Sequence, residues 1–218
     1  MRPLGLYAKR AAMLGLLAGA QLAAQNTQPA FENDQVLIGE KHGQPHDHKL
    51  NRVMIYIGNG GETLHYLDGH DVVLKWGDRD IQWSPASGLH TSEITNKNPV
   101  HLIDIGIKKP GDPHKVVSSA LDPLRVDPKD YKLELENSQV RVMRVKVGPR
   151  QSVPMHEWVV NHVIVYFTDE NVRETSPEGK AEVAQHKAGE FTWSGPSKHT
   201  LENLSDQPFE AAIVELKN

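Results

Sequence analysis

Short hydrophobic runs separated by turn residues follow one another along most of the chain. Residues 53–57 end at a Gly-Asn-Gly-Gly turn over 58–61, residues 71–74 follow a Leu-Asp-Gly turn, and a longer run covers 100–107. Runs of about four to eight residues bounded by such turns are typical of β-strands, and many strands at even spacing indicate a sandwich or barrel. Because no convincing amphipathic helical repeat follows residue 24, the pattern predicts an all-β fold, with a hairpin turn at 58–61.

The first stretch of the chain has a different pattern. Basic Arg2, Lys9 and Arg10 precede an apolar run over residues 11–24, and polar residues follow it. This order is that of a secretory signal peptide, and the run is too short to span a bilayer comfortably. The sequence therefore predicts a signal peptide at residues 1–24, with an uncleaved anchor as the alternative. The mature protein would be periplasmic or secreted, with no membrane contact after the leader is removed.

The two halves of the chain repeat each other at an offset of 110 residues, which becomes 109 after one extra residue in the first half. Corresponding residues include His46 and His156, Asn51 and Asn161, Tyr56 and Tyr166, Trp83 and Trp193, and His90 and His199. Matches of this kind at nearly constant spacing indicate an internal duplication. We therefore expect two similar β-domains, at residues 31–109 and 131–218, joined by a proline-rich linker at 110–130.

Three histidines of the first half have spacings that suit a metal site. Side chains separated by even numbers on a strand share a face, so His46 and His48 project together with Arg52 and Tyr56 if the strand is regular. His90 follows on a later strand that could lie beside them. Three neutral imidazoles with open positions suit Zn, Fe, Ni or Cu. The pattern predicts a divalent transition metal at His46, His48 and His90.

The spacing of these residues resembles the motifs of the cupin family. His46-Asp47-His48 matches the His-x-His core of the first motif, and Pro85 with His90 matches the second. In the second half, Pro154-Met155-His156 opens the first motif, and the segment from His199 to Asn203 keeps the end of the second. The resemblance covers essentially the whole chain after the leader. It implies tandem jelly-roll β-barrels, a bicupin, in a family that includes dioxygenases, isomerases, lyases and binding proteins.

The first half departs from the cupin pattern at the glutamate ligand, because Arg52 stands in its place. A guanidinium about 5 Å from a dication raises its energy by roughly 3 to 7 kcal/mol at an effective dielectric constant near 20. We expect Arg52 to turn aside to an acidic partner, or to bind the carboxylate of a substrate beside the metal.

The second half departs further from the pattern. Trp158 replaces the second histidine, while His162 stands at the glutamate position. His156, His162 and His199 therefore form an altered three-histidine set. A large aromatic ring fills space where a ligand would lie, so this set is expected to bind metal less readily than the first, and inherited barrel histidines without metal are the favoured interpretation.

Two functions remain open for the first barrel. In one, the metal activates a small oxygenated molecule as a Lewis acid or in dioxygenase-like chemistry, with Arg52 orienting an anionic substrate and Tyr56 donating a proton. In the other, the chain is a non-catalytic extracytoplasmic protein that binds or senses a small ligand at a vestigial metal site. The sequence does not decide whether the protein is an enzyme.

Composition removes several other functions. The chain has no cysteine, which excludes disulfides, thiolate ligands and a cysteine nucleophile. Its formal net charge of -4 becomes about -7 once the three basic residues of the leader are removed. The remaining lysines and arginines are scattered, so nucleic acid is not an expected partner. A small molecule is the expected partner, and assembly into a homo-oligomer is left open.

Overall fold

The computed structural model describes residues 29–39, 44–95 and 101–218, so the predicted signal peptide lies outside the described residues. The first half contains strands β1 (Phe31–Glu32), β2 (Val36–Ile38), β3 (His46–His48), β4 (Asn51–Ile57), β5 (Gly60–Tyr66), β6 (Asp71–Trp76), β7 (Ile81–Ser84), β8 (Ser87–Ile94) and β9 (His101–Ile107). After the short helix α1 (Pro123–Val126), the second half contains β10 (Tyr131–Glu136), β11 (Val140–Val147), β12 (Ser152–Trp158), β13 (His162–Tyr166), β14 (Glu170–Thr175), β15 (Ala181–His186), β16 (Phe191–Ser194), β17 (Ser197–Asn203) and β18 (Phe209–Leu216).

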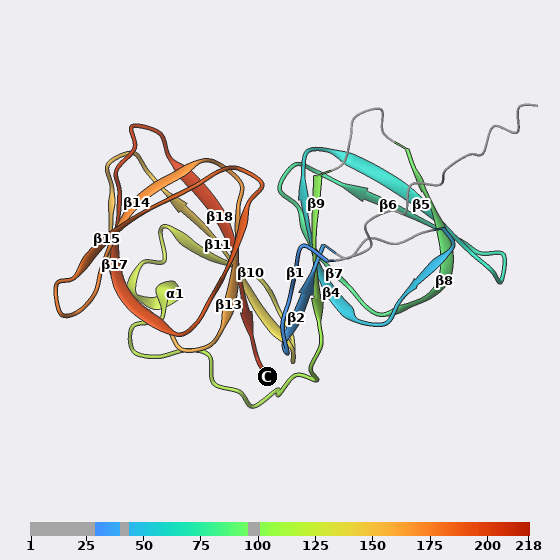
Figure 1. The fold of residues 1–218 in the computed structure, drawn as a ribbon, viewed down its shortest axis with the longest axis horizontal. Coiled ribbons are helices and arrows are strands. Elements are labelled where there is room, and N and C mark those ends of the chain that lie inside the picture. The colour runs from blue at the N-terminus through green and yellow to red at the C-terminus, as the bar shows by residue number, and fades with distance from the viewer. Residues whose placement is uncertain (1–28, 40–43, 96–100) are drawn as a thin grey trace, which may run out of the picture.

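Each half folds into a barrel of two antiparallel sheets, and the two barrels lie side by side (Figure 1). The sheets of the first barrel have the orders β1-β2-β9-β4-β7 and β3-β8-β5-β6. Those of the second barrel have the orders β10-β11-β18-β13-β16 and β12-β17-β14-β15. Register repeats as well, since His46 pairs with His90 and His156 with His199. The all-β prediction is therefore confirmed, and the repeated register agrees with a duplication.

The largest hydrophobic core lies between the two barrels. Side chains that alternate along β4 and β9, such as Val53, Ile55 and Ile105, are fully buried against the corresponding strands of the second barrel, including Val163 and Val214. Their neighbours in sequence point the other way, into the first barrel. Because alternate residues of a strand face opposite sides, one strand contributes to both the contact between the barrels and the interior of its own barrel.

Hydrogen bonds that cross between the barrels repeat with approximate two-fold symmetry. The amide of Asn51 donates to Oε1 of Gln139 over 2.6 Å, and the amide of Asn161 donates to Oε1 of Gln35 over 2.6 Å. These four residues occupy corresponding positions in the two halves. These half-buried amide pairs join the facing strands of the two barrels beside the shared hydrophobic core.

The predicted linker at 110–130 contains α1, whose N-cap Asp122 accepts a hydrogen bond from the backbone N–H of Leu124. Val117, Asp122 and Asp127 are buried. The end of this segment therefore packs on the second barrel, which its proline content did not indicate. No helix among the described residues is long and apolar enough to cross a membrane.

Two local expectations differ from the structure. The strand expected to carry His46 through Tyr56 is divided, because β3 belongs to one sheet of the first barrel and β4 to the other. The turn at 58–61 is not a hairpin, because β4 and β5 also lie in different sheets and do not pair with each other. Both differences have one cause: the chain crosses between the two walls of the barrel at these points.

Candidate metal centre

The first barrel encloses a cavity of about 890 Å³. Strands from both of its sheets contribute side chains to the wall, so the division between β3 and β4 still brings their residues together. The predicted site residues His46, His48, Arg52, Tyr56 and His90 all line this cavity. The structure therefore gathers the complete set that the sequence proposed for the first barrel.

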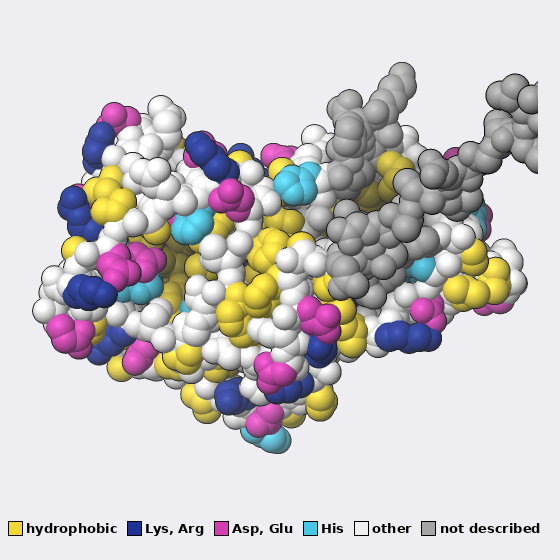
Figure 2. All heavy atoms as spheres, viewed as in Figure 1, with side chains coloured by type: hydrophobic (Ala, Val, Ile, Leu, Met, Phe, Trp, Pro, Cys, Tyr) yellow, Lys and Arg dark blue, Asp and Glu magenta, His cyan; other side chains and the backbone are white. Residues whose placement is uncertain are grey.

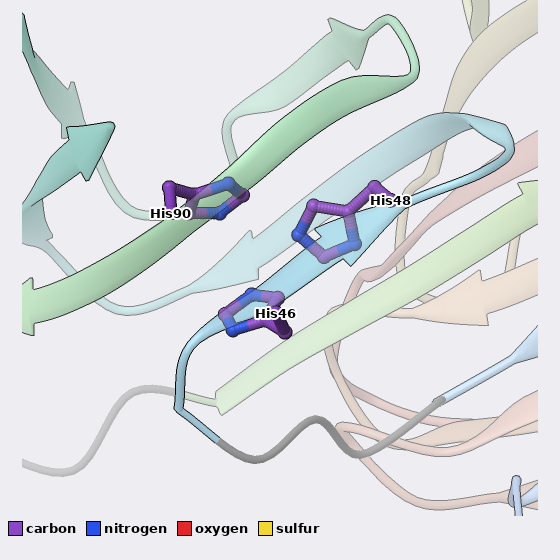
Figure 3. Close-up of side chains that lie close together, drawn as sticks. All are labelled: His46, His48 and His90. Carbon is purple, nitrogen blue, oxygen red and sulfur yellow. The ribbon is translucent and has the colours of Figure 1, made fainter. Parts of the chain in front are cut away.

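The three imidazoles of this barrel lie against one another (Figure 3). His46 and His48 come from β3, and His90 comes from β8, where it is the cross-strand partner of His46. Each ring offers one potential ligand nitrogen, and these three nitrogens all lie within 4.8 Å of one another. Ring centroids are separated by 4.6 Å for His46 and His90 and by 5.3 Å for His48 and His90. This three-histidine group fits a divalent metal ion.

His90 shows most directly that the group suits a ligand. Its ring is 1% exposed, and its Nδ1 donates to the carbonyl oxygen of Gly88 over 2.7 Å. Because Nδ1 carries the proton, Nε2 of the neutral ring is an acceptor with a free lone pair. Nε2 is buried and has no hydrogen-bond partner. A buried acceptor without a partner costs free energy unless a ligand satisfies it, and a metal ion would do so.

Arg52 holds a position that competes with such an ion. Its Nη1 lies 3.0 Å from Nε2 of His48 and 3.2 Å from Oδ2 of Asp104, and its Nη2 donates to the hydroxyl of Ser84 over 2.8 Å. The arginine therefore pairs with an acidic residue, as one of the two expectations for it requires. Because the guanidinium can only donate, it occupies the acceptor nitrogen of His48.

Two carboxylates of this cavity were not predicted from the sequence. Asp104 lies on β9 and binds Arg52, and Glu62 lies on β5. Burial raises the pKa of Glu62 above its ordinary value, and the nearby Arg52 opposes that rise. Strict alternation along β5 could have found Glu62, because it shares a face with apolar Leu64 and Tyr66.

Tyr56, the predicted proton donor, is deeply buried in this cavity. Its ring stacks on Trp76 with centroids 4.3 Å apart. Burial raises the pKa of Tyr56 to about 12. At neutral pH the phenol therefore keeps its proton, so it can act as a donor and not as a base.

The second barrel brings two of its histidines together but does not form a group of three. His156 and His199 are cross-strand partners with ring centroids 4.5 Å apart. The ring of Trp158 lies 5.1 Å from that of His162 and 5.7 Å from that of His156. Within the described part of the chain, His46, His48 and His90 are the residues whose ligand atoms meet the distances of a metal group. The altered set of the second barrel does not.

Comparison with known proteins gives structural neighbours only. No family model matches the chain, and no curated protein sequence does. AerE from Microcystis aeruginosa aligns over 85% of this chain and 89% of that chain, with a TM-score of 0.57 and 12% identity. A cupin 2 conserved barrel domain protein from Leptotrichia buccalis aligns over 85% and 86%, with a TM-score of 0.51 and 14% identity.

Oxalate decarboxylase from Bacillus subtilis aligns over 85% of this chain and 68% of that chain, with a TM-score of 0.54 and 14% identity. The chain has the two-barrel cupin fold. The fold expected from the spacing of His46 and His48, and of Pro85 and His90, is thus confirmed. At such low identities the likeness concerns the fold alone, and the chemistry of this chain has to be argued from its own residues.

Burial in the second barrel changes how its histidines titrate. Desolvation, together with the like charge of neighbouring His199, lowers the pKa of His156 to about 4. Desolvation also lowers the pKa of His199 to about 4, with His162 as the like charge nearby. Both rings are therefore neutral at pH 7, as imidazoles in a buried pocket must be unless a counter-ion accompanies them.

These shifts predict a loss of stability in mild acid. Between about pH 6.5 and 4 the unfolded chain binds a proton at each ring while the folded chain does not, so the free energy of unfolding falls as pH falls. From pH 7 to 5 we expect each ring to contribute about 2 kcal/mol of this loss. Urea unfolding of metal-free His156→Gln should show a correspondingly smaller loss, with exposed His114→Gln as the control. Equal losses in wild type and His156→Gln would contradict the prediction.

Proposed function

We propose that the first barrel binds a divalent transition metal ion through His46, His48 and His90, and binds a small oxygenated molecule in the adjoining cavity. The buried, unpartnered Nε2 of His90 within a group of three imidazoles is the observation that supports this most strongly. Iron, zinc, nickel and copper all accept such ligands. One structural neighbour, the oxalate decarboxylase of Bacillus subtilis, is described as having Mn(II) centres, which adds manganese to the metals to be tested.

A metal bound there would supply Lewis-acid polarisation of a carbonyl or, if redox-active, activation of O₂. The residues of the chain then have separate tasks. Arg52 is held in the wall of the cavity by His48, Asp104 and Ser84, and its positive charge there would attract and orient an anionic substrate. Tyr56 keeps its proton and would donate it to a developing oxyanion. Glu62, whose pKa is raised by burial, would accept or return a proton.

A second candidate function is binding or sensing of a small ligand without catalysis. The contact between Arg52 and Nε2 of His48 favours it, because the guanidinium satisfies that nitrogen without a metal. In both cases we propose that the protein is exported and acts in the periplasm or outside the cell, on the basis of the leader at residues 1–24.

Metal content tests the first candidate. Mass spectrometry of tag-free protein, reconstituted and then freed of loosely bound metal, should find close to one divalent ion per chain. His46→Ala and His90→Ala should lose it, because each removes a ligand of a three-ligand site. The matched variant His156→Ala removes a corresponding residue of the second barrel and should retain the ion.

Two outcomes would contradict the metal site. If wild-type protein takes up no metal after reconstitution, the metal site is wrong and the second candidate, ligand binding without catalysis, remains. Metal that persists in His46→Ala and His90→Ala, with circular dichroism showing both variants folded, would place the ion elsewhere.

A further inference from the structure

The second barrel encloses a cavity of its own, with a volume of about 310 Å³. Figure 2 shows a hollow on this half of the molecule, at left, where hydrophobic, acidic and histidine side chains come together. The volume stands at the lower end of the roughly 300 to 1,000 Å³ of small-molecule sites. It would therefore fit a ligand with few heavy atoms.

Aromatic rings form much of the wall. Tyr131, Trp158, Tyr166 and Phe209 line the cavity, and each is almost completely buried. The rings of Tyr131 and Trp158 are 6.1 Å apart and inclined by 58°. Aromatic faces carry partial negative charge and attract cations, most strongly when water is excluded. Because packing on the core fixes these rings, a cation would meet preorganised faces.

The charged groups of the cavity are both acidic. Glu170 and Glu174 lie on the same face of β14 and line the cavity, whereas Arg173 between them lies on the opposite face and pairs with Glu202 over 2.7 Å. Among the described residues that line this cavity, none is lysine or arginine. Glu170 accepts a hydrogen bond from Nδ1 of His186 over 2.8 Å.

Glu174 is the carboxylate that is best placed to bind a ligand. Its Oε1 lies 3.8 Å from Nε2 of His199, which is too long for a hydrogen bond. The side chain is 45% exposed even though it belongs to the wall of a cavity. A carboxylate in this position is accessible to a ligand and retains capacity to accept hydrogen bonds.

The interior of this cavity also differs from that of the first barrel at one decisive position. His162 corresponds to Arg52, and its Nδ1 lies 3.1 Å from the carbonyl oxygen of Val160. A carbonyl can only accept, so Nδ1 donates and Nε2 is left as an acceptor. Where the first cavity has a buried cation, the second therefore has a neutral ring that accepts hydrogen bonds.

We propose that the second barrel binds a small organic cation of the alkylammonium class. The charge lies beside Glu174 and Glu170, and the alkyl groups contact the faces of Trp158, Tyr131 and Tyr166. Both the carboxylates and the aromatic faces attract positive charge and repel an anion of the same size. A bare metal ion would use the carboxylates but gain little from the aromatic wall.

Titration calorimetry of metal-free protein tests this site, with choline and propylammonium as probes. At least one of them should bind with a stoichiometry of one per chain. The neutral analogue of that probe, 3,3-dimethylbutan-1-ol for choline or propan-1-ol for propylammonium, should bind about tenfold or more weakly, because it has similar shape without the charge.

Variants locate the binding. Glu174→Gln keeps the shape of the side chain and removes its charge, so it should weaken cation binding by about tenfold or more. Glu202→Gln removes an equal charge from the outer face of the neighbouring strand and should leave affinity within about twofold, as expected for an exposed ion pair.

Three results would overturn the proposal. They are equal affinity for the cation and its neutral analogue, equal affinity in wild type and Glu174→Gln, and no binding of either cation at millimolar concentration. None of these results depends on whether the first barrel holds a metal, so the two proposals can fail separately.

Discussion

Arg52→Leu should tighten binding of a divalent ion such as Zn²⁺ by about 100-fold or more. A guanidinium nitrogen lies 3.0 Å from Nε2 of His48, and metal to imidazole bonds are about 2.1 Å long. An ion bound by that nitrogen would therefore lie within about 5 Å of the guanidinium. The repulsion of roughly 3 to 7 kcal/mol that this implies is reduced by the partner Asp104. Removing Arg52 also frees the acceptor nitrogen of His48.

Competition with a chromophoric chelator would measure the change in affinity. Arg52→Lys is the matched control, because it keeps a positive charge at the same position and should stay close to wild type. Leucine supplies no ligand of its own, so tighter binding in Arg52→Leu reports the loss of charge. If Arg52→Leu and wild type bind Zn²⁺ equally, the ion is not held by Nε2 of His48 beside Arg52.

Arg141→Met should lower the free energy of unfolding by about 3 to 5 kcal/mol at pH 8. The guanidinium binds Asp122 over 2.6 Å and Glu215 over 2.5 Å, and it donates to the carbonyl oxygen of Val117 over 3.1 Å. All three charged side chains are almost completely buried. Methionine fills similar volume but leaves two carboxylates in the interior without a cation, which is the costly way to break a buried ion pair.

The same variant should show a pH dependence. Burial raises the pKa of Glu215 to about 7, against the opposing effect of Arg141. Without the arginine, protonation of Glu215 relieves the buried charge, so the destabilisation should be smaller at pH 5 than at pH 8. Urea unfolding at the two pH values measures this difference in destabilisation.

The control variant Arg173→Met breaks an exposed pair with Glu202 and should lower the free energy of unfolding by less than about 1 kcal/mol. Equal losses in the two variants would contradict the role given to Arg141.

Much of the candidate metal centre could be predicted from the chain alone. His46 and His48 have the spacing of residues on one face of a strand, and the repeat relates His90 to His199. The three candidate ligands and the presence of two barrels therefore follow from the pattern of the sequence. Asp104 could not be assigned in the same way, and alternation along β5 gives the face of Glu62 but not what lies beside it. A lone carboxylate in a strand is usually solvent-exposed, and only the closure of the barrel places these two beside Arg52.

The linker shows the same limit. Proline content correctly indicates that residues 110–130 form neither a long helix nor a strand. It does not indicate that Asp122 is buried beside Arg141, since that contact joins residues 19 positions apart in sequence. Buried ion pairs of this kind depend on the surfaces that folding brings together, and no local pattern encodes them.

The sequence by itself determined the all-β character of the chain, the internal repeat and the three histidines of the first barrel, because strand periodicity, repeat spacing and ligand spacing can be seen in the order of the residues. Alternation along β4 places Val53 and Ile55 on one face and Arg52, Met54 and Tyr56 on the other. It does not indicate which face packs against the other barrel and which lines the cavity. Only the tertiary structure decided that the valine and isoleucine face is buried against the other barrel and that the arginine face lines the cavity. The reason is physical: both faces of this strand are covered, one by a second domain and one by the barrel's own opposite wall.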